Sequence, residues 1–279
     1  MRVRTSDGLE LELDGRGPAG GEGTALLLHG LGGCAQAWGE AALDGLARAR
    51  RVLAIDLIGH GRSDDPADAQ RVGLERVLDD LERALDAAGV DACAWVGYSM
   101  GGRIALAAAL LRPERVRGLV LESASPGLAT PLQRRARRAQ DESLAVRIEQ
   151  RGVDAWVEEW EGSPLFAGRQ QLAAHARGRF LELRRANRAA SLAAWLRGLG
   201  VGTQPSFWER LEEVRAPVLL VTGGNDERYG EIAREMATKM PDARHVVVPD
   251  AGHTVHLESP TAWVHAVEAF LDEGLEAMR

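Results

Sequence analysis

Short apolar runs alternate with longer amphipathic segments along most of the chain. The apolar runs of strand length lie at residues 25–28, 51–55, 92–96, 118–121, 218–222 and 244–248. Segments with helical spacing of apolar residues lie at 35–48, 74–88, 100–111, 229–240 and 260–276. Short apolar strands with helices between them are typical of a mostly parallel sheet. The pattern therefore predicts an α/β fold with helices on both faces of the sheet.

Two segments at the N-terminus follow a different pattern. Residues 2–5 and 9–13 alternate polar and apolar side chains, and Asp7-Gly8 separates them. A period of two, interrupted by Asp-Gly, is typical of antiparallel strands joined by a tight turn. We expect this hairpin to lead into the sheet.

The strand pattern is interrupted between residues 121 and 218. This stretch is rich in Arg, Ala, Gln and Glu and contains four of the seven Trp. A loop of that length does not fit inside a compact domain. We therefore expect a helical insertion, residues 128–204, that forms a cap over an α/β core made of residues 1–127 and 205–279.

Composition and charge narrow the classes of function. The 279 residues are 45% hydrophobic and carry a formal net charge of -7, which argues against nucleic acid or an anionic membrane surface as a partner. The two cysteines are too few for a disulfide framework. The sequence shows no metal-ligand cluster, dinucleotide fingerprint or phosphate loop, so we expect neither a metal nor a cofactor. The charged N-terminus and the lack of a long apolar stretch predict a soluble, cytoplasmic protein.

A candidate nucleophile lies between a predicted strand and a predicted helix. Residues 97–101 read Gly-Tyr-Ser-Met-Gly, the G-x-S-x-G sequence of a nucleophile elbow. Such an elbow needs a strained strand-to-helix turn with glycines on either side, because neighbouring backbone comes close to the serine. Ser99 is therefore the candidate nucleophile. The alternative interpretation is a glycine-rich turn with an ordinary capping serine.

A second glycine-rich loop follows the first central strand. Residues 29–33 read His-Gly-Leu-Gly-Gly, at the place where an α/β-hydrolase fold has the loop that donates one N–H to an oxyanion hole. We expect the backbone N–H groups of Leu31 and Met100 to form this pair. A glycine turn that serves only tight packing is the alternative.

A serine hydroxyl needs a neighbouring base to take its proton. His253 follows the last predicted strand, directly after Gly252, and precedes a predicted helix near Pro260. It is the candidate base, and His256 is the alternative.

The third member of a triad orients the imidazole. Asp226 follows the predicted strand 218–222 and lies between Ser99 and His253 in the chain. The order Ser, acid, His is that of the α/β-hydrolases. Asp226 is the candidate acid, and Glu122, at the end of an earlier strand, is the alternative.

Several longer segments carry a family resemblance. Residues 97–103 (GYSMGGR), 122–128 (ESASPGL) and 251–258 (AGHTVHLE) resemble the 2-succinyl-6-hydroxy-2,4-cyclohexadiene-1-carboxylate synthases of the menaquinone pathway. Segments of the expected cap, including residues 134–141 and 164–166, resemble them as well. The turn at 223–225 departs from the pattern, but no triad position is lost.

The resemblance implies a lyase rather than a hydrolase. Enzymes of this family eliminate pyruvate from a cyclohexene carboxylate that carries succinyl and enolpyruvyl groups, and the triad acts as a base. Such a substrate carries several carboxylates, for which arginine is a suitable partner.

The resemblance also implies which side chains bind this small anionic substrate. The candidates are Arg103, Arg137, Arg184, Tyr98 and Trp160, and Arg134 or Arg138 could replace Arg137. A serine carboxylesterase and a catalytically silent binding protein are the two other hypotheses.

Overall fold

The structure is a computed structural model that describes residues 1–18 and 23–276. Its centre is a sheet of eight strands in the order β1-β2-β4-β3-β5-β6-β7-β8. The strands are β1 (Arg2–Arg4), β2 (Glu10–Arg16), β3 (Thr24–Leu28), β4 (Arg51–Asp56), β5 (Cys93–Tyr98), β6 (Val116–Glu122), β7 (Val218–Gly223) and β8 (Ala243–Val248). The pairs from β4 to β8 are parallel, whereas β1 and β2 are antiparallel at one edge. The predicted strands, the hairpin and the mostly parallel sheet are confirmed.

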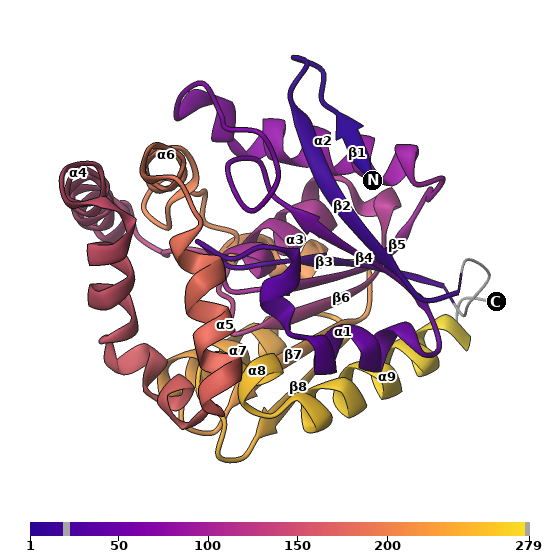
Figure 1. Ribbon diagram of the computed structural model, residues 1–279. Helices are drawn as coiled ribbons and strands as arrows, with labels where there is room; N and C mark the ends of the chain where they lie inside the picture. The colour runs from indigo at the N-terminus through magenta and orange to yellow at the C-terminus, as the bar shows by residue number, and fades with distance from the viewer. Residues whose placement is uncertain (19–22, 277–279) are drawn as a thin grey trace.

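Helices cover both faces of the sheet (Figure 1). They are α1 (Glu40–Ala47), α2 (Leu74–Ala87), α3 (Met100–Leu111), α7 (Glu227–Lys239), α8 (Val255–Glu258) and α9 (Pro260–Glu276). Successive residues of a strand point to opposite faces. Leu26 and Leu28 accordingly pack into one core cluster with α2, α3 and α7, whereas Ala25 and Leu27 pack into a second cluster with α1 and α9. Because both faces are buried there, the central strands β3–β7 are mostly apolar rather than alternating.

One predicted helix is wrong in its extent. The segment 35–48 is divided into a short 3₁₀-helix, Ala35–Trp38, and the separate helix α1. Gly39 lies between them with φ 77°, a conformation that interrupts a right-handed helix and that glycine adopts at little cost. The apolar spacing continues across this break, which is why the sequence pattern did not reveal it.

The chain between β6 and β7 is helical. It contains α4 (Pro131–Glu161), a 3₁₀ segment η4 (Pro164–Gln171), α5 (Ala174–Arg185) and α6 (Ala189–Leu199). Figure 1 shows α4, α5 and α6 gathered beside one end of the sheet. We call residues 131–199 the helical segment. Its role as a cap, and the division at residues 127/128 and 204/205, stay predictions.

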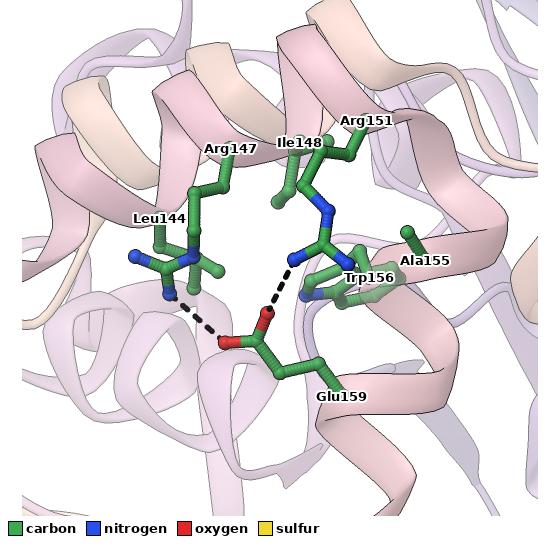
Figure 2. A pocket seen from close by; sticks show the side chains of 7 residues that line it. All are labelled: Leu144, Arg147, Ile148, Arg151, Ala155, Trp156 and Glu159. Carbon is green, nitrogen blue, oxygen red and sulfur yellow. Dashed lines mark hydrogen bonds and ion pairs between the residues drawn. The ribbon is translucent and has the colours of Figure 1, made fainter.

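Helix α4 bends sharply near its middle. Gly152 has φ 81° and ψ 173°, which are not helical angles. Across the bend, Glu159 lies 3.0 Å from Arg147 and 4.0 Å from Arg151 (Figure 2). These exposed ion pairs contribute little to stability, about 0–1 kcal/mol each, but they join the two halves of the bent helix.

Among residues 1–18 and 23–276, no helix combines the length and the apolar character that crossing a membrane requires.

Candidate active site

The register of the parallel strands brings the loops after β3, β5, β6, β7 and β8 to one edge of the sheet. Leu28 of β3 pairs with Gly97 of β5, and Tyr98 at the end of β5 pairs with Glu122 at the end of β6. Gly223 of β7 pairs with Val248 of β8. Parallel strands share their carboxyl edge, where α/β folds generally bind ligands. The loops that follow these strands carry the candidate residues.

Ser99 occupies a strained turn between β5 and α3. Its φ is 52°, which is uncommon for a residue with a side chain. A Cβ at Gly97 would collide with the Gly101 carbonyl, and a Cβ at Gly101 would collide with the Leu28 carbonyl. The glycines therefore permit the close backbone approach that a nucleophile elbow needs.

The side chains of Ser99, His253 and Asp226 lie in a row. His253 Nδ1 is 2.6 Å from Asp226 Oδ2, and His253 Nε2 is 3.3 Å from Ser99 Oγ. An ionised carboxylate only accepts hydrogen bonds, so Nδ1 carries the proton and the Nε2 lone pair faces the serine hydroxyl. His253 is 1% exposed. This arrangement allows the imidazole to take a proton from Ser99.

The alternative acid and base form a separate pair. Glu122 Oε1 and Oε2 lie 2.8 and 2.9 Å from His256 Nδ1, and Glu122 Oε1 also accepts a bond from the His256 N–H. Both side chains are buried. Asp226, in contrast, is the N-cap of α7 and accepts a bond from the Tyr229 N–H at 3.4 Å while it contacts His253. The geometry thus favours Asp226 as the partner of His253.

Glu258, which the sequence reasoning missed, holds the loop that carries His253. Its Oε2 accepts a bond from the Gly252 N–H at 2.6 Å, and its Oε1 accepts one from the Thr254 N–H at 3.1 Å. One carboxylate therefore binds the backbone on both sides of His253. The sequence shows a glutamate near the candidate base, but its hydrogen-bond partners are set only when the loop folds.

Replacing Glu258 by alanine leaves two backbone N–H groups in this loop without their acceptor. We expect the free energy of unfolding to fall by about 1–3 kcal/mol, because unsatisfied donors cost roughly that much. Urea denaturation measures the change. Glu213→Ala is a matched control, since Glu213 pairs with Arg210 at the surface and its loss should leave the free energy of unfolding close to that of wild type. Equal stability of Glu258→Ala and wild type would contradict this role.

The loop after β3 lies against the elbow. A Cβ at Gly30 would be 2.8 Å from the Tyr98 ring and 3.6 Å from Ser99 Cβ. His29 Nε2 accepts a bond from the Leu57 N–H, and His60 Nε2 accepts one from the Gly32 N–H. Burial lowers the pKa of both imidazoles, so they stay neutral and can accept these bonds. These bonds hold the loop in place.

The loop and the elbow also carry the two candidate N–H donors. Leu31 lies in the loop after β3, next to Gly30, and Met100 begins α3 directly after Ser99. Their use as an oxyanion hole stays a prediction.

Arg103 lies one turn into α3 and is buried. Its Nη1 donates to the Leu199 carbonyl at 3.3 Å and to Gln204 Oε1. Among the described residues, no carboxylate lies within 4.0 Å of its guanidinium. Burial lowers its pKa to about 10, and the cation of Arg137 adds to this effect. The protein thus keeps a buried cation with only neutral acceptors on a residue whose backbone lies one helical turn from Ser99.

The other candidate arginines differ in their surroundings. Arg137 on α4 binds Asp141 at 2.7 Å and is partly exposed. Arg184 on α5 is buried, and its Nη2 donates to the Leu31 carbonyl at 3.2 Å. Burial, with a contribution from Arg169, lowers the pKa of Arg184 to about 10.

Arg134 and Arg138 bind backbone carbonyl groups. Arg134 donates to the carbonyls of Leu128 and Ala129, and Arg138 donates to that of Gly202. Nothing in these contacts favours either residue over Arg137.

Aromatic rings line the His253 side of the site. Tyr98 is buried, with ring centroids 5.5 Å from His253. Trp160 is half-buried and stacks on Phe166 at 5.7 Å, and Phe166 contacts the His253 ring edge-on at 5.6 Å. Phe166 therefore connects Trp160 to the imidazole of His253.

Arg169 is the second residue that the sequence reasoning missed. Its Nη2 donates to the Tyr98 hydroxyl at 2.9 Å, its Nε donates to Thr254 Oγ1 at 2.8 Å, and its Nη1 donates to Glu161 Oε1 at 2.6 Å. It is 1% exposed. A single arginine in an irregular 3₁₀ segment carries no sequence signal of such contacts.

Among the residues that the structure describes, no cluster of three His, Cys, Asp or Glu side chains could hold a metal ion.

Comparison with known proteins agrees with the observed fold and also identifies related proteins. Residues 25–260 match the family model described as the alpha/beta hydrolase fold. A Bacillus subtilis (strain 168) protein named "Putative 2-succinyl-6-hydroxy-2,4-cyclohexadiene-1-carboxylate synthase" is 40% identical over 271 residues, 97% of this chain and 98% of that protein. The 2-succinyl-6-hydroxy-2,4-cyclohexadiene-1-carboxylate synthase of Enterobacter sp. (strain 638) is 33% identical over 254 residues, 90% of this chain and 93% of that protein.

A solved structure of MenH from S. aureus superposes with a TM-score of 0.89 at 28% identity, covering 95% of this chain and 98% of that one. The resemblance seen in residues 97–103, 122–128 and 251–258 is confirmed. The chain belongs to the alpha/beta hydrolase fold family and, within it, to the family of 2-succinyl-6-hydroxy-2,4-cyclohexadiene-1-carboxylate synthases.

Proposed function

We propose that this protein is a carbon–oxygen lyase of menaquinone biosynthesis. It eliminates pyruvate from 2-succinyl-5-enolpyruvyl-6-hydroxy-3-cyclohexene-1-carboxylate and forms 2-succinyl-6-hydroxy-2,4-cyclohexadiene-1-carboxylate. Family membership supports this reaction. The observation that carries it is the buried cation of Arg103, one helical turn after Ser99 in α3, which among the described residues donates only to neutral groups. A site with such a cation is suited to an anionic substrate.

Ser99, His253 and Asp226 together form the base of the proposed reaction. His253 Nε2 accepts the hydroxyl proton of Ser99, and Asp226 stabilises the resulting imidazolium through the 2.6 Å contact with Nδ1. Ser99 then removes a proton from the ring carbon of the substrate. The electron pair of that C–H bond forms the new double bond, and the C–O bond to the enolpyruvyl group breaks. The enolpyruvyl group leaves as an enolate, which takes up a proton and becomes pyruvate, so no acyl-enzyme forms and no net proton is consumed.

The backbone N–H groups of Leu31 and Met100 are proposed to hold the oxygen on which negative charge develops. Donors fixed to the backbone need little reorganisation when the charge forms, and each can contribute about 3 kcal/mol. The hydrogen bonds that His29 and His60 accept from the backbone keep the Leu31 loop in position. No cofactor takes part in this scheme.

The substrate carboxylates are proposed to bind Arg103, Arg137 and Arg184. Arg103 and Arg184 are both buried, and their lowered pKa values reflect the cost of a desolvated cation. A bound carboxylate offsets this cost. Tyr98 and Trp160 complete the pocket wall, and the helical segment, residues 131–199, serves as the cap that carries Arg137, Arg184 and Trp160.

A direct assay tests the proposal against the esterase hypothesis. Purified protein is incubated with the enolpyruvyl precursor, and pyruvate release and diene absorbance are followed together. In a parallel experiment, p-nitrophenyl acetate reports ester hydrolysis. We expect equal amounts of pyruvate and diene with little ester turnover. Efficient ester hydrolysis without pyruvate would reject the lyase and support a carboxylesterase, which uses the same three side chains.

A further inference from the structure

Arg169 connects the helical segment to the chain neighbours of both reacting residues of the proposed site. It lies in η4, yet two of its nitrogens bind side chains of the α/β core. Tyr98, which accepts from Nη2, directly precedes Ser99 in the chain, and Thr254, which accepts from Nε, directly follows His253. One planar guanidinium therefore contacts the neighbours of the nucleophile and of the base at once.

The surroundings of Arg169 leave it little freedom to move. Its guanidinium carbon lies 3.9 Å from the Phe166 ring centroid and 4.7 Å from that of Phe180. On a third side, Nη1 binds Glu161, a carboxylate that also lies 3.5 Å from Arg184. A buried arginine that is held by three oxygens and two rings has one orientation. Tyr98 and Thr254 also lie 3.1 Å apart, so the two acceptors and the guanidinium form a closed triangle of hydrogen bonds.

We propose that Arg169 is a positioning residue that sets the separation between Ser99 and His253. This inference rests on the proposed role of these two residues as a base. The guanidinium of Arg169 fixes the distance between the side chains of Tyr98 and Thr254. It thereby fixes the relative positions of the adjacent residues Ser99 and His253. Because Arg169 belongs to the helical segment, the alignment of the base depends on that segment being docked on the core. Glu161 compensates the charge, so Arg169 itself does not need the substrate as a counter-ion.

The test uses the full-length protein and two readouts. The first is the rate at which a fluorophosphonate probe labels Ser99, which requires an aligned Ser99–His253 pair but not the natural substrate. The second is kcat and KM for pyruvate release. Arg169→Met keeps the apolar stem and removes all three bonds. We expect labelling and kcat to fall by about 10²-fold with KM unchanged, since a misplacement of about 1 Å costs that much.

Arg197→Met is the matched control, because Arg197 joins α6 to Glu142 and Glu149 of α4 at the surface, away from the site. It should label and turn over like wild type. Arg169→Lys keeps the charge but cannot span three acceptors, so we expect it to restore only part of the rate. Thr254→Val removes one acceptor and keeps the arginine, and it should lower the labelling rate in the same direction even if Arg169→Met does not fold.

Three results would overturn the inference. The first is a wild-type labelling rate of Arg169→Met or Thr254→Val. The second is full recovery of the rate by Arg169→Lys, which would indicate a role of the charge alone. The third is a rise in KM of Arg169→Met without a change in its labelling rate. If wild type labels at Ser99 but releases no pyruvate, the lyase proposal fails while the labelling rates still decide the role of Arg169. If wild type does not label, the activated serine and this inference fail together.

Discussion

Ser99→Ala is expected to lower kcat for pyruvate release by about 10²–10⁴-fold, the range that a positioned general base contributes. The hydroxyl of Ser99 is 3.3 Å from His253 Nε2, and alanine leaves no oxygen at that place. KM should change little, because the proposed carboxylate contacts come from arginines rather than from Ser99. Alanine tolerates the φ of 52° about as poorly as serine, so the variant should fold equally well.

Steady-state kinetics of pyruvate release and a thermal melt of the same preparation measure this effect. His253→Ala should lose a similar factor, and the double variant should lose hardly more than either single one, because residues that act as a unit are not additive. Glu122→Gln is the informative comparison, since Glu122 binds His256 and not His253. A Ser99→Ala protein that keeps wild-type kcat would contradict the proposed base.

Arg103→Ala is expected to have the second largest effect, mainly on substrate binding. Removing one partner of a buried, hydrogen-bonded charge pair costs about 2–5 kcal/mol, which corresponds to a rise in KM of at least about 30-fold. The buried guanidinium has no carboxylate within 4.0 Å among the described side chains, and we propose that a substrate carboxylate is its counter-ion. Arg103→Lys should recover only part of the affinity, because an ammonium does not bind a carboxylate bidentately.

The control for this prediction is Arg135→Ala. Arg135 is exposed on α4. Its replacement changes the net charge by the same amount but leaves the residues of the proposed site unchanged. Initial rates over a range of substrate concentrations separate KM from kcat. If Arg103→Ala and Arg135→Ala had the same KM, the substrate would not bind Arg103 and the polycarboxylate site would have to lie elsewhere.

The sequence by itself determined the sheet and the positions of the candidate catalytic residues along the chain. Apolar runs of strand length are readable because β3–β7 are buried on both faces. Ser99, Asp226 and His253 could be named because each lies in the loop that follows a predicted strand, and parallel strands end at one edge. These are local patterns, and the register of the sheet then brings distant loops together.

Only the tertiary structure decided which acidic residue serves which histidine. Glu122 and Asp226 both follow strands, and His253 and His256 are three residues apart, so chain order alone left both pairings open. In the fold, the loop after β8 presents His253 to Asp226 and His256 to Glu122.

The contacts of Glu258 and Arg169, and the break at Gly39, were likewise beyond sequence patterns. Hydrogen bonds such as that from Arg169 to Tyr98 join residues far apart in the chain, and they depend on side-chain direction and loop geometry. Periodicity records which positions are buried along an element. It holds no information about which buried polar groups meet once the helical segment docks on the sheet, and that docking decides the arrangement of the site.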